Sequence, residues 1–144
     1  MKQFRSFFLA GIIQGSNTGN VLHDQDYRAR IKSILRRHFP EAKIFDPMEK
    51  HPDSVHYDYR TGESVFLGYI KLAGECDCMI AYLPEASMGT AVEMWECYKK
   101  GVPVWTIGPL KDNWSVKFLS RKIFESLDEF ETYLKVNFSP KPGA

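Results

Sequence analysis

The residues from Cys76 to Val104 (CDCMIAYLPEASMGTAVEMWECYKKGVPV) constrain the fold more than any other stretch of this chain. A continuous apolar run, Met79 to Leu83, is followed by a polar turn and a helical pattern from Met88 to Lys100. That pattern ends at Gly101, and a second apolar run covers Val102 to Ile107. Continuous apolar runs are typical of strands buried on both faces of a parallel sheet, and parallel strands need a crossover helix between them. The stretch therefore predicts a strand–helix–strand unit.

The same alternation continues along the rest of the chain. Further strands are expected at Phe4–Ala10, Ala42–Phe45 and Lys122–Phe124, and further helices begin at Asp24 or Asp26, at Thr61 or Ser64, and at Ser126. Alternating strands and helices predict a parallel sheet with helices on both faces. Five short strands favour an α/β, flavodoxin-like (Rossmann-like) three-layer sandwich with the strand order 2-1-3-4-5. In that order, the loop after strand one and the turn before the fourth helix meet at the ligand-binding crevice.

Length, charge and cysteine content narrow the class of protein. The 144 residues, 44% of them hydrophobic, suit one domain, expected over residues 1–138, with residues 139–144 as a frayed tail. A net charge of +1 gives no attraction to nucleic acid or anionic membranes, and no apolar run approaches the roughly 20 residues of a spanning helix. Three cysteines argue against a disulfide framework. We therefore expect a cytoplasmic protein that binds neither nucleic acid nor membranes and holds no metal.

Two connecting segments are candidates for ligand binding. The segment GIIQGSNTGN (residues 11–20) follows the first strand, and it is either a binding loop or an ordinary connection. Its glycine spacing is not GxGxxG, so no dinucleotide cofactor is predicted. The segment from Met48 to Arg60 is either a lid or a surface loop, and it is rich in His and Tyr: His51, His56, Tyr57 and Tyr59. The basic residues of the first helix, Arg28 among them, are expected to form a solvated face.

The turn SMGTAVE admits two interpretations of Glu93. Thr90 and Glu93 have the spacing of a capping box, in which the Glu side chain would bond back to the start of the helix. Alternatively, the positive end of the helix keeps the Glu93 carboxylate ionised, while free amides near Ser87 and Gly89 bind an anion. An ionised carboxylate beside an anion site suits attack on a sugar carbon.

These residues together resemble the nucleoside 2-deoxyribosyltransferase family, including its nucleoside 5′-monophosphate N-glycosidase branch. The resemblance spans roughly Phe4 to Pro109 and is carried by Phe8–Ile12, Gln14–Gly15, Tyr27–Arg28, Asp46–Pro47, Asp77 and Ser87–Glu93. It implies that Glu93 attacks the anomeric carbon and forms a covalent glycosyl-Glu intermediate, resolved by water or by a second base. No cofactor is implied.

The resemblance also implies roles for the surrounding residues. Substrate binding is expected from Gly11, Ile12, Gln14, Asp46, Tyr69, Ser87, Gly89 and Thr90. Ser at position 87 favours a 5′-monophosphate, because a hydroxyl donates to phosphate whereas an Asp would repel it. A homo-oligomer is expected, in which a neighbouring subunit contributes Asn113 and Trp114, although these could equally form a packed surface loop.

The chain departs from the family at two positions. The family carries an Asp in the helix before strand three, whereas the segment from Phe66 to Lys71 contains none and offers Tyr69 instead. The phosphate-binding branch carries an Arg where this chain has Gln14. Two alternatives to an enzyme follow: a non-catalytic nucleotide or sugar-phosphate sensor on the same fold, and a structural domain in which Glu93 only caps a helix.

Overall fold

Five short strands form one parallel sheet in the computed structural model, which describes residues 3–13 and 24–139. The strands are β1 (Ser6–Gly11), β2 (Lys43–Phe45), β3 (Cys78–Tyr82), β4 (Val104–Ile107) and β5 (Lys122–Phe124). Their order is β2-β1-β3-β4-β5, and every neighbouring pair is parallel. The predicted α/β fold and the order 2-1-3-4-5 are therefore confirmed.

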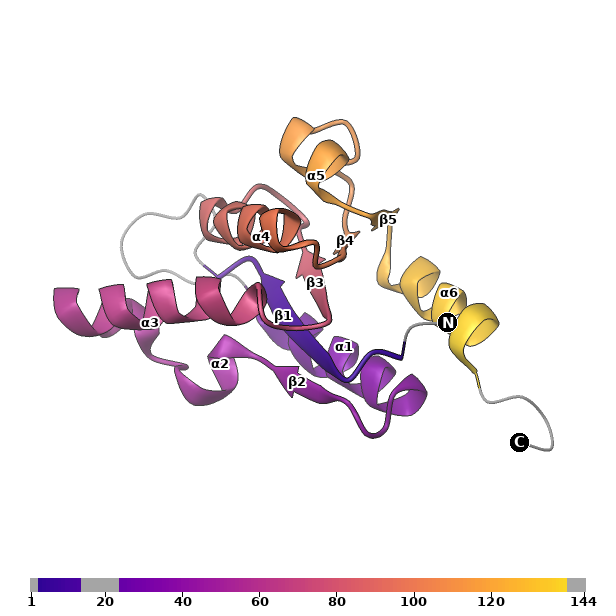
Figure 1. The fold of residues 1–144 in the computed structure, drawn as a ribbon, viewed down its shortest axis with the longest axis horizontal. Coiled ribbons are helices and arrows are strands. Elements are labelled where there is room, and N and C mark those ends of the chain that lie inside the picture. Colours follow the sequence, from indigo (N-terminus) through magenta and orange to yellow (C-terminus); the bar gives the residue numbers. More distant parts are fainter. Residues whose placement is uncertain (1–2, 14–23, 140–144) are drawn as a thin grey trace.

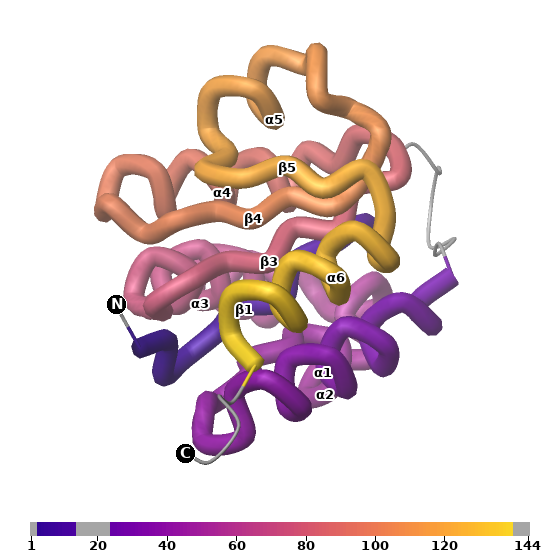
Figure 2. Tube along the Cα trace, turned by 90° about the vertical axis from the view of Figure 1, so that its right-hand side faces the viewer, coloured from indigo at the N-terminus to yellow at the C-terminus, as the bar shows by residue number. Residues whose placement is uncertain are grey.

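Helices cover both faces of this sheet (Figures 1 and 2). Helices α1 (Asp26–His38) and α6 (Leu127–Phe138) pack on one face, and α3 (Tyr59–Ala73), α4 (Met88–Lys100) and α5 (Trp114–Leu119) pack on the other. The short helices α2 (Pro47–Lys50) and η1 (Ser54–His56) lie in the connection from β2 to α3.

Each strand contributes side chains to two cores, because successive residues of a strand point to opposite faces. In β1, Phe7 and Leu9 join the core under α1 and α6, whereas Phe8 and Ala10 join the core under α3, α4 and α5. All four side chains are buried. The central position of β1, with β2 on one side and β3 on the other, explains its uninterrupted apolar sequence.

Three local predictions were wrong. Helix α3 begins earlier than Thr61 or Ser64, because the Asp58 side chain accepts a hydrogen bond from the Thr61 amide at 2.8 Å and caps it. The segment from Gly108 to Ser120 reads from its sequence (GPLKDNWSVKFLS) as a long connection without secondary structure, but it contains α5, capped by Asn113. Arg28 does not belong to a solvated face, because its side chain is only 3% exposed.

No helix in residues 3–13 and 24–139 is long and apolar enough to cross a membrane. Most of the expected frayed tail, residues 140–144, lies outside the described residues.

Candidate active site

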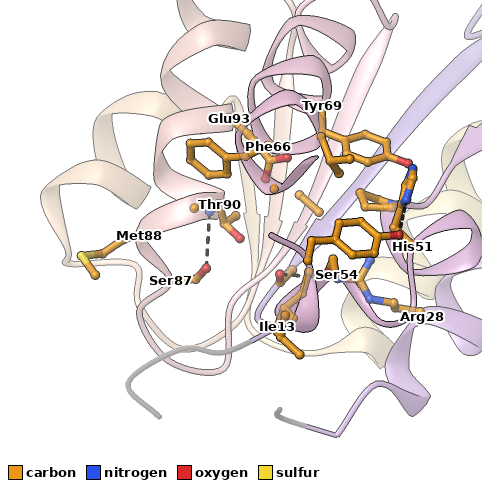
Figure 3. Close-up of a pocket in the computed structure, with 18 residues that line it drawn as sticks. Ile13, Arg28, His51, Ser54, Phe66, Tyr69, Ser87, Met88, Thr90 and Glu93 are labelled. Atoms are coloured by element: carbon orange, nitrogen blue, oxygen red, sulfur yellow. Dashed lines mark hydrogen bonds between the residues drawn. The ribbon is translucent and has the colours of Figure 1, made fainter. Parts of the chain in front are cut away.

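A pocket of about 350 Å³ lies where β1 ends and α4 begins. This is the crevice between β1 and β3 at which the order 2-1-3-4-5 reverses direction. Its walls come from four regions that are far apart in the sequence: the end of β1, Arg28 of α1, the segment between β2 and α3 together with α3 itself, and the first two turns of α4. Figure 3 shows these side chains converging on one space.

The start of α4 forms one wall of the pocket. Ser87 caps the helix, because its hydroxyl oxygen accepts a hydrogen bond from the Thr90 amide at 3.3 Å. Ser87, Gly89 and Thr90 all line the pocket, as does Glu93. The helix therefore begins at Met88, which makes Glu93 its sixth residue and places it beyond the first turn.

Because Ser87 and not Thr90 caps α4, the capping-box interpretation of Glu93 is wrong. The Thr90 amide already donates to Ser87, so it needs no carboxylate from Glu93. No residue in the described part of the chain forms a hydrogen bond with the Glu93 carboxyl group. The carboxyl group instead faces the pocket (Figure 3).

The charge state of Glu93 also differs from the prediction. Burial raises the pKa of Glu93 from 4.5 to about 8, and the opposing effect of the Arg28 charge only limits the rise. Such a rise corresponds to a free energy on the order of 5 kcal/mol, several times the roughly 0.3–1 kcal/mol that a helix N-terminus contributes in its first turn. Desolvation therefore outweighs the helix dipole, and the resting carboxyl group is largely protonated at pH 7.

Arg28 brings a buried positive charge to the opposite side of the pocket. Its guanidinium donates to the Asp46 carboxylate at 2.8 Å and to the Gln25 side chain at 2.8 Å. It also donates to the main-chain oxygens of Leu9 and Gly11. Asp46 is buried as well, receives a second ion pair from Lys32 at 3.0 Å, and caps α2. Asp46 is absent from the pocket lining, whereas its partner Arg28 lines the pocket.

The end of β1 provides the floor of the pocket. Gly11 lines it, and a side chain at this position would collide with the ring and hydroxyl group of Tyr27. Ile12 does not line the pocket: its side chain is 1% exposed within the core under α1 and α6. Its neighbour Ile13 lines the pocket instead. Gln14 lies outside the described residues.

The segment between β2 and α3 closes the remaining side. His51, Ser54 and Tyr57 line the pocket together with Tyr69 of α3. Nδ1 of His51 lies 2.7 Å from the Tyr57 hydroxyl oxygen, and the His51 ring packs edge-on against Tyr69. Burial, followed by the charge of Asp46, raises the pKa of Tyr69. This placement suits the predicted lid, whose closure stays a prediction.

Asn113 and Trp114 lie away from this pocket. Asn113 caps α5 by accepting hydrogen bonds from the amides of Ser115 and Val116, and Trp114 is 78% exposed. Neither lines the pocket of its own chain. Within the described residues, no group of three or more His, Cys, Asp or Glu side chains is placed to hold a metal ion.

Comparison with known proteins identifies solved structures that share this fold. No protein-family model and no curated protein matches the chain. Among solved structures, a 2-deoxyribosyltransferase from Bacillus psychrosaccharolyticus is similar, with a TM-score of 0.66 and 18% identity over 89% of this chain and 91% of that one. A conserved protein from Enterococcus faecalis V583 is also similar, with a TM-score of 0.66 and 16% identity over 92% and 98% of the two chains. The chain therefore shares its fold with a 2-deoxyribosyltransferase, which agrees with the resemblance seen in the sequence.

Sequence reasoning did not assign Arg28 and His51 to the site. Arg28 belongs to a run of five basic residues on one helix, and only the partner Asp46 on another element distinguishes it from the others. The sequence indicated a role for His51 only weakly, through the His- and Tyr-rich composition of the segment from Met48 to Arg60. Which of those side chains faces the pocket depends on the turns of the folded segment.

Proposed function

We propose that this protein cleaves the N-glycosidic bond of a nucleoside or a nucleoside 5′-monophosphate, by hydrolysis or by base exchange. Glu93 is the nucleophile: its carboxylate attacks the anomeric carbon, expels the base, and forms a glycosyl-Glu intermediate. Water or a second base then attacks that intermediate and releases the sugar.

The position of Glu93 carries the proposal. A carboxyl group that faces a pocket without a hydrogen-bond partner among the described residues, and whose pKa is raised to about 8, has no evident structural role. Strongly shifted pKa values concentrate at functional sites. The pocket volume of about 350 Å³ falls in the range of small-molecule sites. The shared fold with a 2-deoxyribosyltransferase supports the reaction class.

Ser87 and Gly89 support binding of a 5′-phosphate or a 5′-hydroxyl group. The Ser87 oxygen accepts from the Thr90 amide, which leaves its hydroxyl hydrogen to donate to a ligand oxygen. Gly89 places no side chain at the start of a 13-residue helix, where main-chain amides favour an anion. Arg28 adds positive charge on the far side of the pocket.

The direct test incubates the protein with a panel of ribo- and deoxyribonucleosides and their 5′-monophosphates, with and without a free acceptor base. We expect release or exchange of the base, and Glu93→Ala should reduce the rate at least about 1,000-fold because no nucleophile remains. Glu96→Gln is the matched control, since Glu96 lies one turn further along α4 and pairs with Lys99 at 3.0 Å. It should keep wild-type activity.

The pH dependence gives a second measurement of the same proposal. A nucleophilic carboxylate must lose its proton, so on a substrate whose leaving group needs no proton kcat/KM should rise about tenfold per pH unit below pH 8 and level off above it. Equal base release by wild type and Glu93→Ala would contradict the proposal, as would a panel in which no substrate is cleaved.

One observation favours a non-catalytic sensor as the second candidate. With its pKa at about 8, Glu93 is mostly protonated at pH 7, and a protonated carboxyl group can donate a hydrogen bond to an intact ligand. Calorimetry with the same panel separates the two candidates. Tight binding of a nucleotide that is recovered intact favours the sensor, and turnover favours the enzyme.

A further inference from the structure

His51 and Tyr57 form a hydrogen-bonded pair on the side of the pocket away from Glu93. Nδ1 of His51 lies 2.7 Å from the Tyr57 hydroxyl oxygen, and the two rings meet edge-to-face. Tyr69 contacts the His51 ring at 5.7 Å between centroids. In Figure 3, Glu93 and His51 lie on different sides of the space that the lining residues enclose.

Main-chain hydrogen bonds hold this pair in place. The His51 amide donates to the Pro47 carbonyl oxygen at 3.0 Å, and the Ser54 amide donates to the His51 carbonyl oxygen at 3.2 Å. The Tyr57 amide in turn donates to the Ser54 carbonyl oxygen at 3.2 Å. These consecutive turns bring two side chains six residues apart onto the same wall of the pocket.

Cleavage of an N-glycosidic bond needs a proton donor as well as a nucleophile. When the bond breaks, its electron pair stays on the base nitrogen, and protonation of the base makes it a better leaving group. Among the described residues that line the pocket, Glu93 is the one carboxyl group, and as nucleophile it cannot also be the acid. An arginine guanidinium does not serve as a proton donor of this kind, because it is not deprotonated in proteins. The remaining ionisable groups are His51, Tyr57 and Tyr69.

His51 is the best placed of these three. Burial raises the pKa of Tyr69 and so makes its phenol a weaker acid. The Tyr57 hydroxyl is engaged with Nδ1 of His51, which fixes the imidazole ring and leaves Nε2 as its second proton-carrying atom. No hydrogen bond joins Nε2 to another described residue. Histidine is also the side chain that most often serves as a general acid.

We propose that His51, oriented by Tyr57, donates the proton to the departing base while Glu93 attacks the sugar. This inference rests on the proposed function and deepens it. An oxygen of Glu93 forms the new bond to the anomeric carbon, and the bond to the base nitrogen breaks with its electron pair moving to the base. The proton on Nε2 of the imidazolium moves to the base, which leaves His51 neutral. In the second step, water or the acceptor base attacks the anomeric carbon, and the bond to the Glu93 oxygen breaks with its electron pair returning to the carboxylate. Neutral His51 takes the proton that the attacking group loses.

The test compares two leaving groups on the same sugar. One substrate carries a natural base that the wild-type protein cleaves, and the other carries 4-nitrophenolate, which departs as a stable anion without a proton. Loss of general acid catalysis costs typically 100- to 10,000-fold. We expect His51→Gln to lose at least about 100-fold in kcat on the natural base and less than about fivefold on the nitrophenyl substrate.

Two further variants sharpen the test. Tyr57→Phe keeps the ring but removes the hydroxyl partner, so it should show a smaller loss with the same preference for the nitrophenyl substrate. His56→Gln is the matched control, because His56 is exposed on η1 and absent from the pocket lining, and it should behave as wild type. Circular dichroism checks folding, and Tyr57→Phe carries the test if His51→Gln does not fold.

Equal losses on both substrates would overturn the role of His51 as proton donor, as would full activity of His51→Gln on the natural base. Either result leaves the proposed function intact as long as Glu93→Ala is inactive. Absence of any cleavage by the wild-type protein overturns the proposed function, and the role of His51 with it.

Discussion

Glu93 shows how burial of a single ionisable side chain can oppose folding. Its pKa rises from 4.5 to about 8 on folding, because the pocket surrounds it with protein and removes the water that would stabilise its charge. The folded state therefore holds a proton that the unfolded chain loses above pH 4.5. A carboxyl group kept under such conditions is typical of a site where stability has been exchanged for reactivity.

The upward direction of this pKa shift predicts the effect of Glu93→Gln on the free energy of unfolding. Near pH 4 the two proteins should be about equally stable, since Glu93 is neutral in both states. Between pH 4.5 and 8 the wild type should lose stability relative to the variant by about 1.4 kcal/mol per pH unit, and above pH 8 the difference should stay constant. Urea unfolding at pH 4, 6, 8 and 9 measures this difference. A pH-independent difference would contradict the burial of the charge, and Glu96→Gln serves as the control.

Arg28 and Asp46, unlike Glu93, are buried charged groups that pair with each other. Both are buried, and they form an ion pair at 2.8 Å that links α1 to the end of β2. Lys32 adds a third charge at 3.0 Å from Asp46. Because each of these three charges has a partner, they can remain charged inside the protein, and Arg28 can present its guanidinium to the pocket.

At the scale of elements, the helix ends follow local rules that the sequence revealed only in part. Gly101 ends α4 in the left-handed conformation, with φ of 74°, as predicted. The predicted start of α6 at Ser126 is also confirmed, since the Ser126 oxygen accepts from the Glu129 amide at 3.1 Å. The Glu129 carboxylate accepts from the Glu125 amide, one residue earlier than a capping box requires. Helix α4 begins at Met88 as predicted, whereas α3 begins at Tyr59 and not at Thr61 or Ser64.

Ser126→Ala tests the cap of α6. We expect it to lower the free energy of unfolding by about 1 kcal/mol, because the Glu129 amide loses its acceptor. Ser33→Ala, at an exposed position inside α1, is the control and should be neutral or slightly stabilising, since Ala favours helices. Thermal unfolding of the three proteins measures both effects. Equal melting temperatures for Ser126→Ala and wild type would show that this cap contributes nothing.

At the scale of the whole molecule, one helical layer exposes many large apolar side chains. On α3, α4 and α5 the exposed ones are Tyr59, Phe66, Leu67, Met88, Val92, Trp95, Tyr98, Trp114 and Phe118. Tyr98 and Phe118 line one small surface cavity, which shows that the exposed faces of α4 and α5 adjoin. Clusters of exposed apolar side chains mark interaction surfaces. This layer is also where the predicted neighbour-subunit residue Trp114 lies.

We therefore predict that the protein associates with a second copy of itself through this layer. The double variant Trp95→Glu, Tyr98→Glu places two charges in the middle of the layer and should shift the protein toward a monomer in sedimentation velocity. Val136→Glu is the control, because Val136 is 78% exposed on α6, on the other face of the sheet. A wild-type protein that sediments as a monomer at tens of micromolar would contradict the prediction.

Much of the fold could be predicted because its signals are local. Apolar runs such as Met79–Leu83 indicate buried strands wherever they occur, and the helical pattern between two such runs limits their connection to a parallel crossover. Parallel sheets of this kind have only a few common strand orders, so the order 2-1-3-4-5 could be predicted. Likewise, the placement of Ser87, Gly89 and Glu93 at the pocket depends mainly on one turn between a strand and a helix, and the sequence identified that turn.

The tertiary structure decided what depends on distant neighbours. Whether Glu93 carries a charge depends on its enclosure by α1, α3 and the segment after β2, which no local pattern contains. Arg28 differs from the other basic residues of α1 only because Asp46 lies beside it in space. The pairing of His51 with Tyr57 depends on the turns of the connecting segment. The sequence by itself therefore determined the fold and located the central carboxyl group, and the tertiary structure decided its protonation and the residues that face it.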